Sequence, residues 1–223
     1  MNRLYLVRHA ENPANLTKEF SYRRVDLSLT PKGVLQAKQT AEWFKGKTIH
    51  AIYSSPLKRA AETAGILAAE SGLPVEVMED LREVNVGDLE GQPVTPELWA
   101  YHDSIVADWL GGKPERRFPN GEDYAMLWKR TQAAFGKIVA GRRAENIIVV
   151  GHGGMFSFTL KDLCPGVDLN LLRATENHNC SITEIEIESR HGRLNGQLIA
   201  WARCDHLHGP AAELVSGFMK HDW

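Results

Sequence analysis

Two short apolar runs, far apart in the chain, each lead into a histidine. Residues 4–7 run directly into Arg8 and His9, and residues 147–150 run through one glycine into His152. Uninterrupted runs of strand-forming residues are typical of strands buried on both faces of a parallel sheet. The carboxyl ends of parallel strands lie along one edge of the sheet, and ligands bind beyond that edge. We therefore expect both histidines in one shared site.

Helical and strand patterns alternate around these two runs. Strands are predicted at residues 49–53 and 74–78, and helices at 31–45, from 56 onward, from 121 to 141 and at about 155–163. Residues 11–30 are polar and predict a long irregular loop, a kind of segment that is often functional. The alternation indicates an α/β fold with three layers, α/β/α, around a mostly parallel central sheet.

Local signals refine the element boundaries. Residues 30–31 (Thr-Pro) and 54–56 (Ser-Ser-Pro) both show a capping hydroxyl followed by proline, which is typical of a helix start. Residues 181–188 and 197–203 are strand-like, and Asn-Gly at 195–196 precedes the second run. This pattern predicts a hairpin or two late edge strands.

The length of 223 residues fits one α/β domain that carries a sizeable insertion. Residues 93–120 contain an amphipathic helical pattern, then two glycines and a basic run. We expect a single domain over residues 1–223, with a helical insertion at about 93–120 as a candidate lid.

Charge and composition exclude several classes of partner. A formal net charge of −2 argues against nucleic acid, because backbone phosphates need a basic surface. No run approaches the roughly 18 apolar residues of a membrane span, and the first run is too short for a signal peptide. We therefore expect a cytoplasmic protein without a membrane partner; the sequence makes no prediction of oligomeric state.

The cysteines lack C-x-x-C spacing, so we expect buried, reduced thiols at Cys164, Cys180 and Cys204.

Arg59 follows the second predicted strand and Glu83 the third, so five reactive groups are expected at one sheet edge. Two guanidiniums, two imidazoles and one carboxylate, without a metal ligand set, indicate a site for an oxyanion. The planar forks of Arg8 and Arg59 match phosphate oxygens, so a phosphoryl group is the predicted ligand. An imidazole can attack phosphorus and form a phosphohistidine that water then opens, while Arg8, Arg59 and His152 neutralise charge in place of a metal.

The leaving alkoxide of such a reaction needs a proton. Glu83 is the candidate acid, and Asp80 is its local rival. Other phosphate chemistries lack their reactive groups, because the chain has no Cys-x5-Arg, no G-x4-G-K-[ST] loop and no D-x-D pair.

Several short motifs, in this order and spacing, resemble those of the histidine phosphatase superfamily, which includes the phosphoglycerate mutases. They are Leu-Val-Arg8-His9-Ala10-Glu11, Asn15, Leu29-Thr30-x-x-Gly33, Ser54-Ser55-Pro56-x-x-Arg59-Ala60-x-x-Thr63-Ala64, Leu81-x-Glu83, Gly87-x-x-Glu90-Gly91, Gly121-Glu122 and Val-Gly151-His152-Gly153. Alanine at position 10 departs from the commoner glycine. The resemblance implies a phosphoglycerate mutase-like fold. From the residues themselves we expect neither a cofactor nor a metal.

The resemblance also implies residue roles. His9 would be the phosphorylated nucleophile and Glu83 the proton donor. The phosphoryl oxygens would be bound by a set of residues from these motifs, namely Arg8, Asn15, Arg59, His152 and Gly153.

The chain resembles the phosphatase branch more than the mutases. After the acid it has Glu83-Val-Asn-Val-Gly87, whereas the mutases have a bulky Glu-Arg-His-Tyr-Gly run. We therefore expect a metal-independent phosphomonoesterase, a hydrolase of the histidine acid phosphatase type, that acts on a small phosphorylated metabolite. The alternatives are a mutase-type phosphoryl transferase and, less favoured, a non-catalytic phosphate-binding module.

Other charged and aromatic residues have simpler interpretations. The acids Glu11, Asp26 and Asp88 are expected to organise loops, and Trp99 and Trp109 to pack against the core. Two basic clusters are expected to be mainly solvated charge, with contact to an anionic substrate as the alternative: Lys18, Arg23, Arg24 and Lys113, Arg116, Arg117. The tail at 205–223 has no predicted placement.

Overall fold

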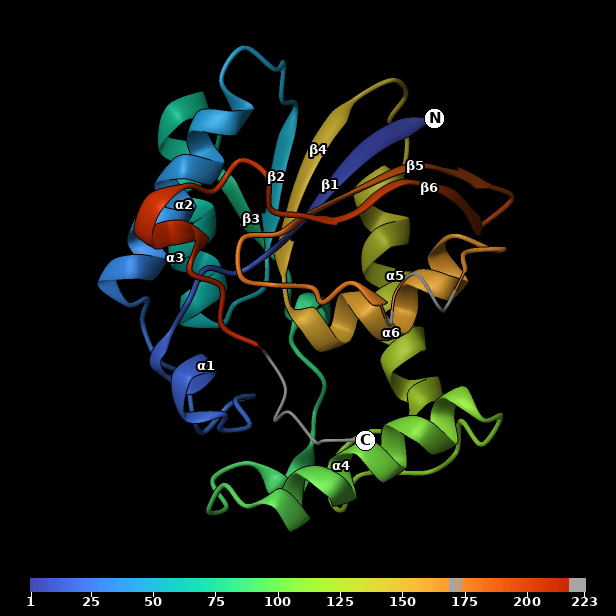
Figure 1. Ribbon diagram of the computed structural model, residues 1–223. Coiled ribbons are helices and arrows are strands. Elements are labelled where there is room, and N and C mark those ends of the chain that lie inside the picture. The colour runs from blue at the N-terminus through green and yellow to red at the C-terminus, as the bar shows by residue number, and fades with distance from the viewer. Residues whose placement is uncertain (169–171, 173, 217–223) are drawn as a thin grey trace.

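The computed structural model describes residues 1–168, 172 and 174–216, and its centre is one six-stranded sheet (Figure 1). The strands are β1 (Asn2–Arg8), β2 (Ala51–Ser54), β3 (Val75–Val77), β4 (Asn146–Gly151), β5 (Ile182–Arg190) and β6 (Arg193–Arg203). Their order across the sheet is β3-β2-β4-β1-β5-β6. The first four strands pair in parallel, whereas β5 pairs antiparallel with both β1 and β6. The mostly parallel central sheet is thus confirmed.

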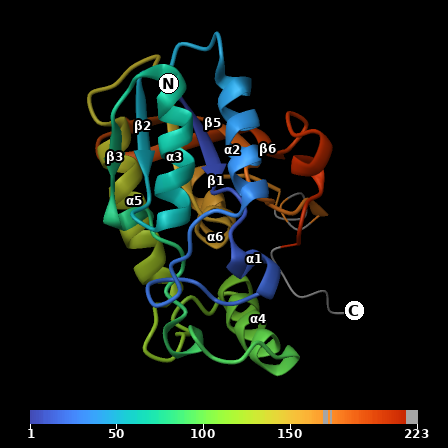
Figure 2. The same cartoon turned by 90° about the vertical axis from the view of Figure 1, so that its left-hand side faces the viewer.

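Helices cover both faces of this sheet (Figures 1 and 2). The described helices are α1 (Pro13–Thr17), α2 (Pro31–Phe44), α3 (Lys58–Ser71), α4 (Pro96–Leu110), α5 (Tyr124–Val139) and α6 (Gly153–Leu163), with short 3-10 turns at Glu79–Leu81, Gly87–Leu89 and Gly209–Ala212. Helices α2 and α3 cover one face, and α5 and α6 cover the other. Leu4 and Leu6 of β1 share a core cluster with residues of α5 and α6. Tyr5 and Val7, on the opposite face of β1, share one with α2 and α3. The three-layer α/β/α architecture is confirmed.

The register of the two central strands brings the histidines to the same level. Val7 of β1 aligns with Val150 of β4, and Arg8 aligns with Gly151. Both valines are completely buried, and burying a side chain of this size contributes about 1.5–3 kcal/mol to folding. The core packing that fixes this register therefore also fixes where His9 and His152 leave the sheet.

One of the two predicted helix caps is right and one is wrong. Thr30 caps α2, since its hydroxyl accepts a hydrogen bond from the amide of Gly33 at 3.0 Å. Helix α3 instead begins at Lys58, without a side-chain cap from its N-cap residue. Asp26 accepts the Lys58 amide at 2.9 Å, and Ser55 is directed to His152. The serine signal is therefore part of the site and not a helix cap.

The segment predicted as an irregular loop contains the short helix α1. Asn12 and Asn15 form a reciprocal capping box around its first turn, and Pro13 stands at its first position. A helix of five residues is too short to produce an apolar periodicity, so capping residues were its only sequence signal.

The two late strands form a hairpin, but its turn is not at Asn195-Gly196. The turn is at His191 and Gly192, whose φ angles are 52° and 76°, as a two-residue hairpin turn of this twist requires. Gly196 lies inside β6, where a Cβ atom would come within 2.5 Å of the Leu163 carbonyl oxygen. Glycine is present there because of close packing against the end of α6. Strand β5 is not an edge strand, because β1 and β6 flank it.

The predicted insertion contains α4, which begins after a Thr95 cap and lies beyond the carboxyl ends of the parallel strands (Figure 1). Its buried face carries Trp99, His102, Ile105 and Trp109. The expected packing of both tryptophans against the core is confirmed. No helix in the described part of the chain is long and apolar enough to cross a membrane.

All three cysteines are free thiols, but their burial differs. Cys164 and Cys180 are buried as predicted, whereas Cys204 is only partly buried. In the tail, the turn Gly209–Ala212 packs on α2, where Gln36 donates to the Ala211 carbonyl at 3.2 Å. Residues 217–223 of the tail lie outside the described residues.

Candidate active site

His9 follows the last residue of β1, and both of its ring nitrogens have assigned partners. Nδ1 lies 2.8 Å from the Ala10 carbonyl oxygen. Because a carbonyl can only accept, Nδ1 carries the hydrogen in this network. Nε2 accepts from Nε of Arg59 at 3.2 Å. The unprotonated nitrogen of His9 is therefore Nε2.

The environment of His9 keeps its ring neutral. The side chain is buried, and this desolvation, followed by the charges of Arg59 and Arg8, lowers the pKa of His9 well below its ordinary value. The hydrogen bond to the Ala10 carbonyl acts in the opposite direction and is smaller. A neutral imidazole whose Nε2 lone pair is free of a proton is a competent nucleophile at neutral pH.

Arg59 lies in the first turn of α3, and Ser21, in the loop between α1 and α2, holds its guanidinium in place. One terminal nitrogen donates to the Ser21 hydroxyl at 2.8 Å and the other to the Ser21 carbonyl at 2.9 Å. Burial lowers the pKa of Arg59 to about 10, against the opposing effect of the Glu83 carboxylate. The guanidinium therefore stays charged at neutral pH.

Arg8 is buried on the other side of His9. Its NH1 group donates to the Asn177 carbonyl, whereas its Nε has no partner among the described residues. A Cβ atom at Gly153 would lie 3.2 Å from that same Nε. Glycine at this position therefore keeps the approach to the Arg8 guanidinium open.

His152 is completely buried, and its ring centroid lies 5.2 Å from that of His9. Its Nε2 is 2.7 Å from the Ser55 hydroxyl, which also accepts the Leu57 amide at 3.3 Å. The Ser55 hydroxyl has no other acceptor for its hydrogen among the described residues, so we assign that hydrogen to the bond with Nε2, which places the ring hydrogen of His152 on Nδ1. Burial, and next Arg59, lower the pKa of His152 well below its ordinary value. Nδ1 is a buried donor without a partner in the described part of the chain.

The carboxylate of Glu83 is fixed at the start of α6. It accepts the amides of Val84 at 2.8 Å, Met155 at 2.7 Å and Gly154 at 3.0 Å. Amides at a helix N-terminus favour an anion at this place. Its predicted rival, Asp80, pairs with Lys137 at 3.5 Å and does not line the pocket.

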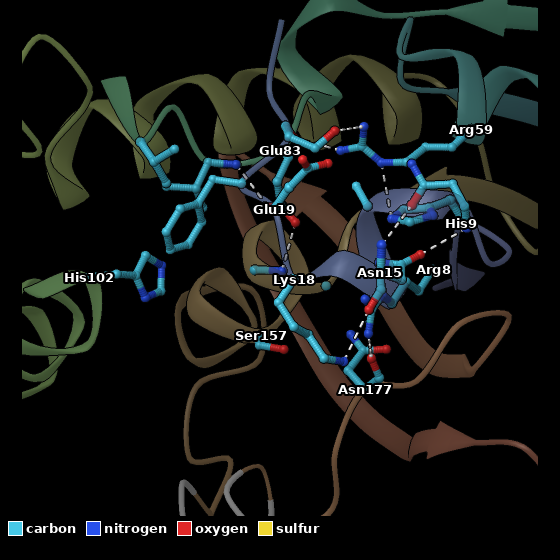
Figure 3. Close-up of a pocket in the computed structure, with 18 of the residues that line it drawn as sticks. Arg8, His9, Asn15, Lys18, Glu19, Arg59, Glu83, His102, Ser157 and Asn177 are labelled. Atoms are coloured by element: carbon cyan, nitrogen blue, oxygen red, sulfur yellow. Dashed lines mark hydrogen bonds between the residues drawn. The ribbon is translucent and has the colours of Figure 1, made fainter. Parts of the chain in front are cut away.

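These side chains meet at one pocket (Figure 3). The pocket is lined by predicted site residues, namely Arg8, His9, Asn15, Arg59, Glu83 and Gly153, together with aromatic and polar residues that include Phe20, Trp99, His102, Ser157 and Phe158. His152 does not reach the pocket surface. It follows the last residue of β4, and its ring lies next to that of His9.

Four polar residues for which the sequence predicted no role in the site hold this arrangement together. They are Ser21, Ser55, Asn177 and Asn179. The side-chain amide of Asn179 donates to the His9 carbonyl at 2.9 Å and to the side-chain oxygen of Asn15 at 3.1 Å. Thr63, already part of the quoted motif, accepts the Ala10 amide at 3.0 Å. The serines and asparagines lie in loops and turns without periodicity, so only the Ser-Ser-Pro motif gave any signal for them.

The expected loop-organising acids and solvated cations have concrete partners. Glu11 pairs with Lys32 at 2.7 Å and accepts the Thr30 hydroxyl at 2.8 Å. Lys113 and Arg116 both pair with Asp108. Lys18 differs, because it lines the pocket while its ammonium donates to the carbonyls of Asn15 and Ser216.

Together the geometry makes a pocket for a dianion. Two guanidiniums and the imidazole of His152 surround the neutral imidazole of His9, whose Nε2 carries no proton. Arg8 lines the pocket, and its Nε is a buried donor without a partner among the described residues; a phosphoryl oxygen would satisfy such a donor. No group of three or more His, Cys, Asp or Glu side chains within the described residues could hold a metal ion.

Comparison with known proteins gives consistent results. The family model of the histidine phosphatase superfamily (branch 1) matches residues 4–198. Putative phosphoserine phosphatase 2 of Hydrogenobacter thermophilus is 34% identical over 194 residues, which cover 87% of this chain and 94% of the relative. Probable phosphoglycerate mutase GpmB of Proteus mirabilis is 31% identical over 202 residues, covering 91% and 93% of the two chains.

Solved structures with the same fold come from bacteria and a protist. The structure of YhfR from Bacillus stearothermophilus has a TM-score of 0.76 at 26% identity, and the match covers 92% of this chain and 99% of that one. A phosphoserine phosphatase from Entamoeba histolytica, solved with 3-phosphoglyceric acid, has a TM-score of 0.74 at 25% identity, with coverage of 93% and 100%.

Proposed function

This chain belongs to branch 1 of the histidine phosphatase superfamily, and we propose that within it the protein is a phosphomonoesterase that hydrolyses a small phosphorylated metabolite without a metal ion. The observation that carries the proposal is the state of His9. Its Nδ1–H is engaged by the Ala10 carbonyl, and its unprotonated Nε2 meets the Arg59 guanidinium in the pocket. This supports an imidazole nucleophile beside a group that binds phosphoryl oxygens.

The first chemical step would transfer the phosphoryl group to His9. The Nε2 lone pair forms a bond to phosphorus while the bond from phosphorus to the ester oxygen breaks. For this step Glu83 has to hold a proton, against the preference of its three amide contacts for the anion. The alkoxide that leaves takes that proton, a contribution worth about 10²- to 10⁴-fold in rate. The products of this step are a free alcohol and phospho-His9.

The second step would reverse these roles. The Glu83 carboxylate takes a proton from water, whose oxygen attacks phosphorus, and the bond between phosphorus and Nε2 breaks. Inorganic phosphate and free His9 result. Arg8, Arg59 and His152 would stabilise the charge on the equatorial oxygens in both steps, and such preorganised donors usually account for most of the rate enhancement in phosphoryl transfer. Asn15 and Gly153 would line the position that the phosphoryl group occupies.

Trapping of the intermediate tests the proposal. Radiolabelled p-nitrophenyl phosphate, quenched during turnover, is expected to leave label on His9 that is stable to alkali and lost in acid. The His9→Ala variant is expected to take up no label and to release no phosphate. Label on another residue, or normal turnover by His9→Ala, would contradict the phosphohistidine route.

A mutase-type phosphoryl transferase is the second candidate, and the similarity to probable phosphoglycerate mutase GpmB favours it. One assay separates the two. 3-Phosphoglycerate is incubated with a catalytic amount of 2,3-bisphosphoglycerate, and both 2-phosphoglycerate and free phosphate are measured. Release of phosphate without isomerisation supports the phosphatase, whereas isomerisation faster than release would establish the mutase.

A further inference from the structure

One wall of the pocket is an aromatic stack that contains a single polar ring. His102 of α4 lies between Phe20, at a centroid distance of 4.9 Å and an interplanar angle of 29°, and Phe118, at 5.4 Å and 27°. Trp99 meets the same ring edge-on at 5.3 Å. Phenylalanine at position 102 would complete an apolar wall, so the imidazole requires a separate explanation.

Among the described residues, only one of the two ring nitrogens of His102 has a hydrogen-bond partner. Nδ1 lies 2.8 Å from a carboxylate oxygen of Asp103, and so carries a hydrogen. Nε2 makes no hydrogen bond with any described residue. The residue is only 6% exposed, yet it lines the pocket. A polar atom in a buried, pocket-lining side chain that has no partner among the described residues is expected to meet a ligand group.

The position of His102 decides which part of a ligand it would meet. In Figure 3 its ring lies across the pocket from Arg8, His9 and Arg59. If those residues hold the phosphoryl group, the opposite wall faces the alcohol portion of the ester. Lys18 also lines the pocket, but its ammonium already donates to two carbonyls.

We propose that His102 is a specificity-determining residue whose Nε2 accepts a hydrogen bond from a hydroxyl or another hydrogen-bond donor on the alcohol portion of the substrate. The inference rests on the proposed function. It narrows the substrate class to small phosphomonoesters with a polar alcohol portion, and it disfavours esters of purely apolar alcohols. Asp103 acts as a positioning residue that fixes the tautomer and the orientation of the ring.

Ligand binding tests this role separately from turnover. In the His9→Ala background, which blocks phosphoryl transfer, calorimetry measures Kd for phenyl phosphate and for three polar esters: 3-phosphoglycerate, O-phosphoserine and glycerol 1-phosphate. The variant His102→Phe keeps the stack and removes Nε2. It is expected to weaken the tightest polar ester about five- to tenfold, as loss of one hydrogen bond implies, and phenyl phosphate less than about twofold. His102→Gln, which can place an amide near the Nε2 position, is expected to recover part of the loss.

Two results would overturn the inference. One is an equal change in Kd for phenyl phosphate and the polar esters in His102→Phe. The other is binding of phenyl phosphate, with His102 present, as tight as that of every polar ester. If His102→Phe does not fold, His102→Leu also removes Nε2 and gives the same comparison, with His102→Gln again as the variant that recovers part of the loss. Failure of the proposed function gives a different result, because the chain with His9 then hydrolyses none of the four esters. The change in Kd for the polar esters, compared with that for phenyl phosphate, still decides the role of His102.

Discussion

Nε of Arg59 donates a hydrogen bond to Nε2 of His9 at 3.2 Å, and this contact joins the first turn of α3 to the end of β1. It identifies the ring nitrogen that keeps its lone pair. The positive charge also disfavours protonation of the ring, so that the pKa of His9, already lowered by burial, is lowered further. One guanidinium thus keeps the proposed nucleophile neutral and stands where it can bind the group that the nucleophile attacks.

Arg59→Lys is expected to lower kcat/KM for p-nitrophenyl phosphate by about a hundredfold or more, because a single ammonium cannot reproduce a planar fork. The arginine makes three contacts, one to His9 and two to Ser21. Steady-state hydrolysis is the measurement. Arg190→Lys is the matched control, since that arginine is exposed and pairs with Glu188. Activity of Arg59→Lys within about threefold of the parent would contradict the assigned importance of the fork.

Gly154→Ala is expected to act on the proposed acid without touching the nucleophile. The added Cβ would lie 2.9 Å from a Glu83 carboxylate oxygen and 3.3 Å from its carboxyl carbon, so the carboxylate must move. We expect kcat to fall at least about tenfold for alkyl esters, which need a proton on the leaving oxygen, and much less for p-nitrophenyl phosphate. Glu83→Gln should show the same selectivity more strongly.

The control for this substitution is Gly136→Ala in the interior of α5. A Cβ there meets nothing within 4 Å, and alanine in a helix interior is favoured over glycine by about 0.5–1 kcal/mol. The control should therefore be slightly more stable and fully active. An equal loss of kcat for alkyl and aryl esters in Gly154→Ala would show that the displaced group is not the acid.

The sequence predicts those residues of the site whose positions depend on regular secondary structure. Arg8 is the last residue of β1, and His9, Arg59, Glu83 and His152 each follow a strand. Strand ends in a parallel sheet converge by topology. Ser21 and Asn177 could not be found in this way. Each reaches an arginine far along the chain from a loop, and such contacts depend on tertiary packing that no local pattern encodes.

The same reason explains the errors in the element boundaries. The serine pair before α3 has the pattern of a cap, but its second hydroxyl is used by His152, 97 positions away. Asn195-Gly196 has the pattern of a turn, but the glycine is required by the nearby carbonyl of Leu163. In both places a contact distant in sequence took precedence over the local preference.

Acidification is expected to destabilise the protein between about pH 6.5 and 4. Burial lowers the pKa of His206 to about 4, and the shifts at His9 and His152 have the same sign. Below about pH 6.5 the unfolded histidines bind protons that the folded ones do not, so stability is fully present above that pH and falls as the pH falls.

Urea unfolding midpoints at about pH 7 and pH 5 measure this effect. His206→Gln is expected to lose less stability on acidification than the parent, because one of the contributing groups is gone. The exposed His208 supplies the control variant, His208→Gln. If the urea midpoint of His206→Gln falls between pH 7 and pH 5 by as much as that of the parent, His206 does not contribute to the loss of stability.

Glu90 is expected to control activity at a distance, through the loop that holds Arg59. One carboxylate oxygen accepts the amides of residues 22–25, at 2.6, 2.7, 2.9 and 3.1 Å. The residue before these amides is Ser21, which fixes the Arg59 fork. Removal of the carboxylate leaves four amides without their common acceptor. Glu90→Ala should therefore lower kcat/KM about tenfold or more, and Glu90→Gln, which keeps an oxygen, by less.

A double-mutant cycle separates this effect from general destabilisation. If Glu90 acts through Arg59, then Glu90→Ala should lower kcat/KM far less in the Arg59→Lys background than alone, because the fork that it orders is already gone. Glu79→Ala removes an exposed acid that pairs with Arg82, and it should leave kcat/KM unchanged both in the parent and in the Arg59→Lys background. Assays are made well below the unfolding temperature of each variant. Additive losses from Glu90→Ala and Arg59→Lys would show that the loop acts on catalysis by another route, with Ser21 as the next residue to test.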